Sequence, residues 1–447
     1  MTRNFVLTAL LSLASMSMLR AQQMQVTSPD KSIVVKLDLN DGKLQYAVMY
    51  ENKVFLEPAR LGLKTSVTDL GSNLQYAGQS DSLIDEHYEN LKIKNSKVHY
   101  VANEKTFSFV NADKKKINVI FRVSNRDVAF CYDLPQTDEN ANYNIVKEYS
   151  SFDFPQQTTT FLTPQAPAMS GWKHTKPSYE EEYIPDAPLG QKSKYGIGFT
   201  FPALYHIAND GWVLLSETGV GSQYCASKLS EGTAEGRFEI SFAEPGENNG
   251  IGAANPSVSL PSTTPWRTIT LGKTLKPIVE TTVAFDLVKQ QYAPSIDYKF
   301  GRSTWSWLMW QDNSIRYEDQ IAYIDLAAQM GFEFCLIDGL WDKQIGKAKV
   351  EELIRYAQSK HVDIYLWYNS NGYWNDAPQG PKNQMNTSRN RQEEMQWMQK
   401  MGVKGIKVDF FGGDKQITLQ LYEDILVDAN KYGLGVIFHG CTLPRGW

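Results

Sequence analysis

The sequence is 447 residues long, 42% of its residues are hydrophobic, and its formal net charge at pH 7 is −5. This is an ordinary globular composition, and the length is sufficient for two or three domains. The mild acidity, without any long basic segment, argues against a nucleic acid as the main partner.

The N-terminus has the pattern of a secretory signal peptide. Arg3 is followed by a short apolar run over residues 5–13 and by small residues up to Ala21. The apolar run is too short to span a membrane. We therefore expect residues 1–21 to be removed, and the mature protein to be periplasmic or secreted without inserting into a membrane.

Residues 22–295 have the alternation of β-strands. Apolar residues at positions 33, 35, 37 and 39 alternate with polar ones, and Asn40-Asp41-Gly42 then supplies the residues of a tight hairpin turn. Similar short runs, interrupted by Pro, Gly and Asn, continue to about residue 295. This region is predicted to be a large antiparallel β super-sandwich.

Residues 296–447 change to a pattern in which strands and helices alternate. Strands are predicted at 305–310, 332–338, 362–368, 405–410 and 435–439, with amphipathic helices between them. This order requires a parallel sheet, which an open doubly wound fold or a closed barrel would satisfy. Polar or aromatic residues recur at the strand ends, which favours a (β/α)8 TIM barrel. A complete barrel has eight strands, so we expect a C-terminally truncated barrel with about five.

Strand 405–410 carries the main candidate for catalysis. Alternation places Lys407 and Asp409 on one face and Ile406 and Val408 on the other. Asp409 can be a nucleophile, a general base or a structural ion-pair partner, and a nearby lysine favours the ionised carboxylate that a nucleophile needs. Lys407 can alternatively be the Schiff-base lysine of a barrel aldolase.

Four further residues at strand ends are candidate substrate contacts: Trp310, Asp338, Asn369 and His439. Each also has a structural interpretation, since an aspartate can cap a turn and a histidine or tryptophan can pack in a core. Aromatic residues make up 12% of the chain, and flat rings suit the apolar faces of sugars. The three carboxylates Glu180, Glu181 and Glu182 offer the oxygen ligands that Ca²⁺ prefers, although Ca²⁺ needs about six to eight oxygens.

Several segments together resemble glycoside hydrolase family 97, over essentially the whole chain. They are Thr27-Ser28-Pro29-Asp30, Ser178-Tyr179-Glu180-Glu181-Glu182-Tyr183, Leu366-Trp367-Tyr368-Asn369, Gly405-Ile406-Lys407-Val408-Asp409-Phe410-Phe411 and Phe438-His439-Gly440. The resemblance implies an exo-acting α-glycosidase, usually calcium-dependent, with a catalytic (β/α)8 barrel.

Within that family, the resemblance is to the retaining, α-galactosidase-like group. That group has an aspartate at the position of Asp409, whereas the inverting, α-glucosidase-like group has a glutamate where this chain has Gly440. By this resemblance Asp409 is the nucleophile, Lys407 contacts a sugar hydroxyl, and Glu180 is a Ca²⁺ ligand with Glu181 or Glu182 as alternatives.

The expected function is therefore removal of terminal α-linked galactose from a glycan with retention of configuration. The general acid/base and the other Ca²⁺ ligands are expected beyond Trp447. An inverting α-glucosidase and a non-catalytic glycan-binding protein are the alternatives.

Overall fold

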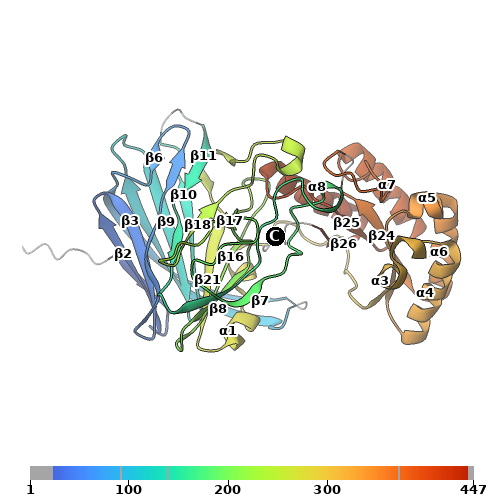
Figure 1. The fold of residues 1–447 in the computed structure, drawn as a ribbon, viewed down its shortest axis with the longest axis horizontal. Coiled ribbons are helices and arrows are strands. Elements are labelled where there is room, and N and C mark those ends of the chain that lie inside the picture. The colour runs from blue at the N-terminus through green and yellow to red at the C-terminus, as the bar shows by residue number, and fades with distance from the viewer. Residues whose placement is uncertain (1–23, 91–92, 138, 140, 371–372, 441–447) are drawn as a thin grey trace, which may run out of the picture.

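The computed structural model describes residues 24–90, 93–137, 139, 141–370 and 373–440. In this part of the chain a large β unit is followed by a smaller α/β unit, drawn at the left and the right of Figure 1. The predicted signal peptide, residues 1–21, lies outside the described residues. None of the described helices is both long enough and apolar enough to cross a membrane.

The β unit is built from short strands that cover most of its length. They are β1 (Gln25–Thr27), β2 (Ile33–Asn40), β3 (Lys43–Tyr50), β4 (Lys53–Arg60), β5 (Leu63–Thr65), β6 (Asp69–Leu70), β7 (Gln75–Glu89), β8 (Lys97–Val110), β9 (Lys116–Ser124), β10 (Asp127–Leu134), β11 (Asn142–Glu148), β12 (Ser151–Asp153), β13 (Thr158–Leu162), β14 (Ile184–Pro188), β15 (Ala203–Ile207), β16 (Gly211–Thr218), β17 (Lys228–Leu229), β18 (Arg237–Ser241), β19 (Ser257–Ser259), β20 (Ser262–Thr263) and β21 (Trp266–Gly272). Two 3-10 turns, η1 (Trp172–His174) and η2 (Glu247–Gly250), lie in its loops.

Two antiparallel sheets enclose the core of this unit, which confirms the predicted β-sandwich. One sheet has the order β1-β2-β3-β4-β12-β18-β17, and the other has the order β14-β13-β15-β16-β21-β10-β9-β8-β7, with β20 paired to β10. A smaller sheet has the order β19-β11-β5-β6. Side chains from both large sheets, such as Val35 and Phe121, belong to one hydrophobic cluster.

The β2–β3 hairpin shows how local sequence sets this architecture. The strands pair from Ile33 opposite Tyr50 to Asn40 opposite Lys43, as the alternation predicted. Asp41 and Gly42 both have positive φ, 48° and 67°. A two-residue hairpin turn requires positive φ at both positions, because the twist of such a turn matches the twist of the flanking strands.

The sandwich core also contains a buried ion cluster. The Arg267 guanidinium contacts Glu148, with an Nη2–Oε2 distance of 2.6 Å, and it also contacts Glu217. All three side chains are at most 1% exposed. Burial of charges is tolerated here because the two carboxylates share one guanidinium that satisfies both by hydrogen bonds.

The α/β unit alternates strands and helices. Its elements are β22 (Ser303–Trp305), α3 (Trp307–Trp310), η3 (Gln311–Ser314), α4 (Tyr317–Met330), β23 (Phe334–Ile337), α5 (Trp341–Gln344), α6 (Lys347–Ser359), β24 (Asp363–Asn369), α7 (Ser388–Met401), β25 (Gly405–Asp409), α8 (Gln416–Tyr432) and β26 (Gly435–Phe438). Two short helices that precede it, α1 (Leu275–Glu280) and α2 (Val283–Asp286), pack against the β unit.

The five strands of this unit form a parallel sheet in chain order, β22-β23-β24-β25-β26. Ile406 and Val408 of β25 are buried in a cluster with helix residues such as Leu353 and Ile425. The helices therefore cover one face of the sheet, and Lys407 and Asp409 lie on the other, as alternation predicted. In the described residues the sheet is open, with β22 and β26 at its edges.

One predicted strand is wrong in its extent. Residues 305–310 were expected to be a strand, but β22 ends at Trp305 and α3 begins at Trp307. A short apolar run does not distinguish a strand from a helical turn by its period. The turn allows Trp307 to stack on Trp305, with ring centroids 5.5 Å apart.

Loops of the β unit pack against the ends of β24 and β25. The Tyr179 hydroxyl donates to Asp414 Oδ2 at 2.6 Å, and the Asp414 N–H donates to Glu247 Oε2 at 2.6 Å. Glu247 and Asp414 are both buried. A second contact between the two units joins His174 Nδ1 to Asp376 Oδ2 at 2.6 Å. The β unit therefore supplies part of the wall around the carboxyl ends of the parallel strands.

Candidate active site

A cavity of about 540 Å³ lies at the carboxyl ends of the parallel strands. Residues of both the β unit and the α/β unit line it. Its described lining consists of Trp172, Thr175, Lys176, Ser178, Glu180, Trp305, Trp307, Gln311, Asp312, Asp338, Trp367, Gln379, Lys407, Asp409, Phe410, His439 and Gly440. In parallel β/α folds this end of the strands is where binding and catalytic residues collect.

Asp409, the last residue of β25, places a buried and oriented carboxylate in this cavity. It is only 4% exposed. Its Oδ2 accepts a hydrogen bond from Trp367 Nε1 at 3.0 Å, and its Oδ1 accepts one from the Phe410 N–H at 2.8 Å. Lys407 Nζ lies 3.8 Å from Oδ2. The two hydrogen bonds, one to each oxygen, fix the direction of the carboxylate.

The backbone after Asp409 is also held in an uncommon conformation. Phe410 has a φ of +62°, which is rare for an aromatic residue. Its carbonyl accepts hydrogen bonds from Ser370 Oγ at 2.9 Å and from Trp374 Nε1 at 2.8 Å. These bonds to the loop after β24 maintain a strained backbone immediately beside the carboxylate.

Because Gly440 has no side chain, the Asp409 carboxylate can lie directly beside it. A Cβ atom at position 440 would lie 2.5 Å from Asp409 Oδ1. The residue also has a φ of +50°, which favours glycine. The absence of a side chain at position 440 and the presence of a carboxylate at position 409 are therefore sterically linked.

Asp338, at the end of β23, forms a second buried charge centre with Lys407. Lys407 Nζ donates to Asp338 Oδ2 at 3.1 Å, Trp305 Nε1 donates to the same oxygen at 2.6 Å, and the Gly339 N–H donates to Oδ1 at 2.8 Å. Burial raises the pKa of Asp338, and Lys407 opposes this shift. The Lys407 ammonium also lies 4.1 Å from the centre of the Trp305 ring.

His439 links Asp409 to the β unit. Its Nδ1 lies 3.0 Å from Asp409 Oδ2, and its Nε2 lies 3.2 Å from Glu180 Oε1. The hydrogen bond with Asp409 raises the pKa of His439, against the effect of burial. The imidazole is thus held between two carboxylates, with 45% of its side chain exposed.

Of the three consecutive glutamates, only Glu180 lines this cavity. Glu181 is held by Lys176 and Lys194, with Nζ–Oε distances of 3.0 and 3.3 Å. Glu182 lines a separate cavity in the β unit. The predicted first choice for a metal ligand is therefore the one whose carboxylate faces Asp409 and His439.

Two predicted contacts do not line the cavity in the described structure. Asn369 is fully buried, and its side chain bonds to Asn375 at 3.3 Å, so it supports the loop after β24. Trp310 is 52% exposed and packs edge-on against Tyr323. The turn after β22 directs Trp310 away, and Trp305 and Trp307 take its expected place in the cavity wall.

Sequence reasoning missed Asp312, Gln379 and Trp172, which also line the cavity. Asp312 accepts hydrogen bonds from Trp307 Nε1 at 3.1 Å and from Gln379 Nε2 at 2.8 Å. Trp172 comes from the β unit and packs near Phe410, with ring centroids 6.0 Å apart. These residues come from three separate loops, and no spacing in the sequence brings them together.

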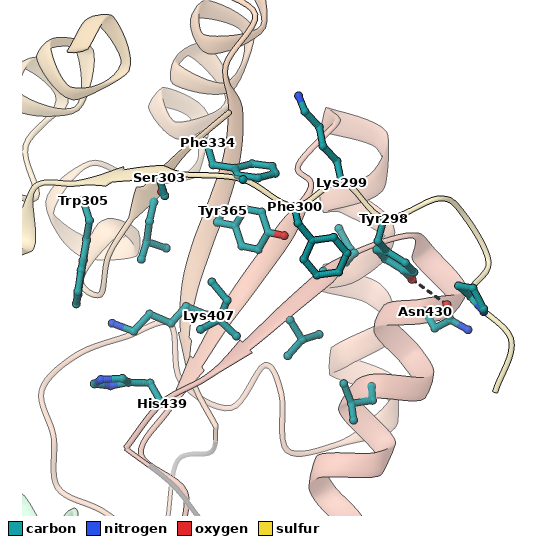
Figure 2. Close-up of a pocket in the computed structure, with 18 of the residues that line it drawn as sticks. Tyr298, Lys299, Phe300, Ser303, Trp305, Phe334, Tyr365, Lys407, Asn430 and His439 are labelled. Atoms are coloured by element: carbon teal, nitrogen blue, oxygen red, sulfur yellow. Dashed lines mark hydrogen bonds between the residues drawn. The ribbon is translucent and has the colours of Figure 1, made fainter. Parts of the chain in front are cut away.

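A second cavity, of about 710 Å³, continues along the same face of the sheet (Figure 2). It shares Trp305, Lys407 and His439 with the first cavity. The rest of its lining is mostly apolar, as Figure 2 shows for Phe334 and Tyr365. Lys407 and His439, which line both cavities, thus lie where the mostly apolar cavity meets the polar one.

Comparison with family models covers nearly the whole described chain. Residues 26–289 match the model described as glycosyl-hydrolase 97 N-terminal, and residues 298–447 match the model described as glycoside hydrolase 97. The two matched regions correspond to the β unit and the α/β unit.

Three known proteins are similar over most of the chain. A probable retaining alpha-galactosidase from Streptomyces bingchenggensis is 24% identical over 92% of this chain, and the match spans 61% of that protein. A retaining alpha-galactosidase from Bacteroides thetaiotaomicron is 24% identical over 97% of this chain and 67% of its own length. A crystal structure of a beta-arabinopyranosidase is 53% identical, with a TM-score of 0.94, over 95% of this chain and 68% of that one.

Proposed function

Because the chain belongs to glycoside hydrolase family 97, we propose that the protein is an exo-acting retaining glycosidase in which Asp409 is the nucleophile. The observation that carries this proposal is the oriented, buried Asp409 carboxylate at the end of β25, beside the side-chain-free Gly440. Lys407, Asp338 and His439 surround the same cavity and are proposed to bind the hydroxyl groups of the terminal sugar.

In the proposed reaction, an Asp409 oxygen forms a bond to the anomeric carbon while the bond to the leaving-group oxygen breaks. A general acid donates the proton that the leaving oxygen takes up. Water, deprotonated by the same residue, then displaces Asp409, and the two inversions give net retention. An ionised, preoriented carboxylate suits the first step because it needs no rearrangement to attack.

The general acid is proposed to lie outside the described residues. The other carboxylates that line the cavity are already engaged: Asp338 by Lys407, Asp312 by Trp307 and Gln379, and Glu180 by His439. The chain spans 61% of the length of one retaining relative and 67% of the other, which supports this assignment. We likewise propose that the open parallel sheet is part of a closed (β/α)8 barrel, and that the protein is periplasmic or secreted.

Two terminal sugars are proposed as substrates. The curated relatives support an α-galactoside, whereas the more similar structure supports a β-arabinopyranoside. β-L-Arabinopyranose has the ring configuration of α-D-galactopyranose but lacks the hydroxymethyl group on C5. A single site can thus accept both rings, and identity of 53% against 24% favours the arabinopyranoside as the better substrate.

Glu180 is the residue proposed to hold Ca²⁺, on which this family generally depends. Its Oε1 contacts His439, and Oε2 of the same carboxylate, whose side chain is 58% exposed, can be donated to a hard cation. When bound, Ca²⁺ would supply positive charge that orients substrate oxygens. Glu181 is less suited because two lysines already neutralise it.

The test uses protein expressed from its complete coding sequence in the presence of Ca²⁺. Hydrolysis of p-nitrophenyl β-L-arabinopyranoside, α-D-galactopyranoside and α-D-glucopyranoside is compared in wild type, in Asp409→Ala and in Asp38→Ala, an exposed control on β2 of the sandwich. We expect Asp409→Ala to lose several orders of magnitude in kcat. Added azide should restore turnover and give a glycosyl azide of the opposite anomeric configuration.

The inverting, non-catalytic and aldolase alternatives each predict a different experimental result. An inverted first product from the wild type, seen by NMR, would support an inverting α-glucosidase. Glycan binding without turnover of any substrate would support a non-catalytic binding protein. A borohydride-trapped adduct on Lys407 would support the aldolase chemistry.

A further inference from the structure

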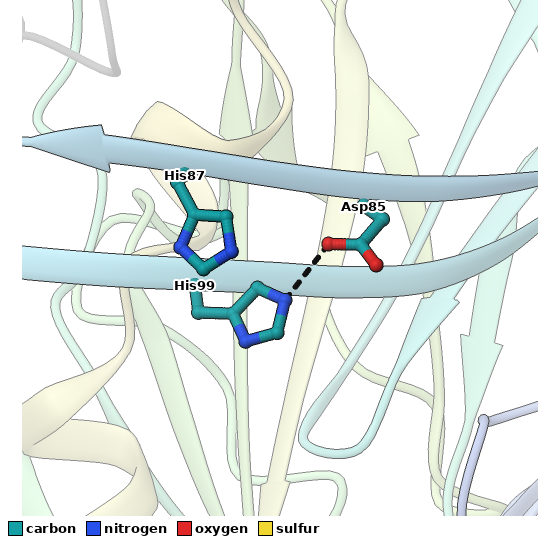
Figure 3. A group of neighbouring side chains, drawn as sticks. All are labelled: Asp85, His87 and His99. Atoms are coloured by element: carbon teal, nitrogen blue, oxygen red, sulfur yellow. Dashed lines mark hydrogen bonds and ion pairs between the residues drawn. The ribbon is translucent and has the colours of Figure 1, made fainter.

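Two histidines and an aspartate form a cluster on the outer hairpin of the larger sandwich sheet. The described group is Asp85, His87 and His99, whose candidate ligand atoms all lie within 4.8 Å of one another. His99 Nε2 lies 2.8 Å from Asp85 Oδ1, and the two imidazole rings are stacked with centroids 4.0 Å apart (Figure 3).

The register of the hairpin brings the three side chains together. His87 of β7 is directly opposite His99 of β8, and Asp85 is two residues before His87 on the same face. Side chains directly opposite each other on an antiparallel pair have Cβ atoms about 4.5–5.5 Å apart. The alternate residues Tyr88, Val98 and Tyr100 pack on the inner face, so the cluster is held outward.

We propose that Asp85, His87 and His99 form a binding site for a divalent transition-metal ion of the Zn²⁺ class. Two imidazole nitrogens and one carboxylate oxygen are ligands that suit Zn²⁺ and Cu²⁺, with waters completing the coordination. Tetrahedral coordination at the usual bond lengths requires ligand atoms about 3.3 Å apart. Exposed side chains reach this spacing by rotation, and here His99 and Asp85 are 52% and 57% exposed.

The surrounding charges are compatible with a bound cation. Asp85 provides one negative charge within the site. The next outward-facing pair along the hairpin is Glu89 with Lys97, whose Oε1 and Nζ atoms lie 3.8 Å apart, so the charge of this lysine is offset by a carboxylate. The His99–Asp85 contact is replaced on binding, because both atoms become ligands.

This site differs in place and chemistry from the proposed Ca²⁺ ligand. It lies on β7 and β8 of the sandwich, and β7 is the edge strand of its sheet, whereas Glu180 faces the cavity at the ends of the parallel strands. Ca²⁺ prefers oxygen ligands, and imidazole nitrogens select transition metals. A metal joining β7 to β8 would also stabilise an edge that is otherwise exposed to pairing with another chain.

Zn²⁺ binding is measured by titration calorimetry on the complete, EDTA-treated protein in about 1 mM Ca²⁺, which occupies oxygen-donor sites. We expect one Zn²⁺ per chain at this site, with a rise in Tm. His99→Asn and His87→Asn should each weaken it at least tenfold, since losing even an outer hydrogen-bond partner of a ligand costs about 10- to 100-fold. His361→Asn, an exposed histidine elsewhere, is the matched control and should leave binding unchanged.

Electron paramagnetic resonance of bound Cu²⁺ identifies the ligand atoms directly, so it distinguishes loss of a ligand from loss of folding. Cu²⁺ bound to the wild type should show electron paramagnetic resonance coupling to two nitrogens, and Asp85→Asn should keep the two-nitrogen signal while weakening Zn²⁺ binding. The proposal is overturned if the wild type binds no Zn²⁺. It is equally overturned if His99→Asn binds Zn²⁺ like the wild type, or if His361→Asn loses as much as His99→Asn.

Discussion

The substitution Gly440→Ala tests whether the geometry around Asp409 is needed for catalysis. The added Cβ would lie 2.5 Å from Asp409 Oδ1 and 3.2 Å from the Phe410 nitrogen. Ordinary contact begins at 3.4 Å, so the carboxylate must move by about 0.9 Å. Oδ1 is the oxygen that accepts the Phe410 N–H, so this hydrogen bond is weakened by the same movement.

Two separate costs follow from this change. Alanine in a left-handed conformation costs about 1–2 kcal/mol relative to glycine, which lowers stability. A displacement of about 1 Å in a reacting group can lower the rate about 100-fold. Gly440→Ala should therefore lose a modest amount of stability and a large part of its kcat.

The matched control is Gly331→Ala. Gly331 ends α4 with a φ of +64°, and nothing lies within 4 Å of a Cβ added there. It carries the same conformational cost without the clash. For both variants, Tm is measured by thermal unfolding, and kcat and KM are measured with an aryl glycoside that the wild type cleaves.

We expect Gly440→Ala to lose at least as much Tm as Gly331→Ala, because it adds the clash to the conformational cost, and we expect a kcat about 100-fold lower only in Gly440→Ala. If kcat in Gly440→Ala stays within a few-fold of that in Gly331→Ala, the close approach of Gly440 does not position the nucleophile. The steric link between positions 409 and 440 would then be refuted.

Two further predictions concern stability. Burial, reinforced by the neighbouring Asp414 carboxylate, raises the pKa of Glu247 from 4.5 to about 8. Between these two pH values the folded state keeps the Glu247 carboxyl protonated while the unfolded state loses the proton. The free energy of unfolding therefore decreases as the pH rises from about 4.5 to about 8. Tm should fall from pH 5 to pH 8 and fall less in Glu247→Gln, and equal slopes would contradict the assignment. Arg267→Met should cost about 3–5 kcal/mol in chemical denaturation, because it leaves Glu148 and Glu217 buried without a counter-charge. The exposed-pair control Arg302→Met should cost about 0–1 kcal/mol, and equal costs would refute the buried-cluster argument.

The sequence predicted much of the fold because its local periods are strong. Alternation identified the β2–β3 hairpin and its turn at Asp41 and Gly42, and it put Lys407 and Asp409 on one face of their strand. The same reasoning failed at residues 305–310, where a run of tryptophans and aliphatic residues fits a strand or a helical turn equally well. There, the chain forms a helical turn in which Trp307 stacks on Trp305.

For the candidate site, the sequence by itself determined which residues stand at strand ends and which face they take, since a period of two fixes side-chain direction within a few residues. Glu180 was already the first choice among the three adjacent glutamates, and the tertiary structure shows that it lines the cavity. Only the tertiary structure shows that Asn369 lies in a buried loop contact and that Asp312 and Trp172 line the cavity. These outcomes depend on how loops distant in sequence pack on one another. A local pattern carries no record of that packing, because Glu180 and Trp172 reach the cavity from the β unit, while Asn369 and Asp312 bond to residues of the loop after β24.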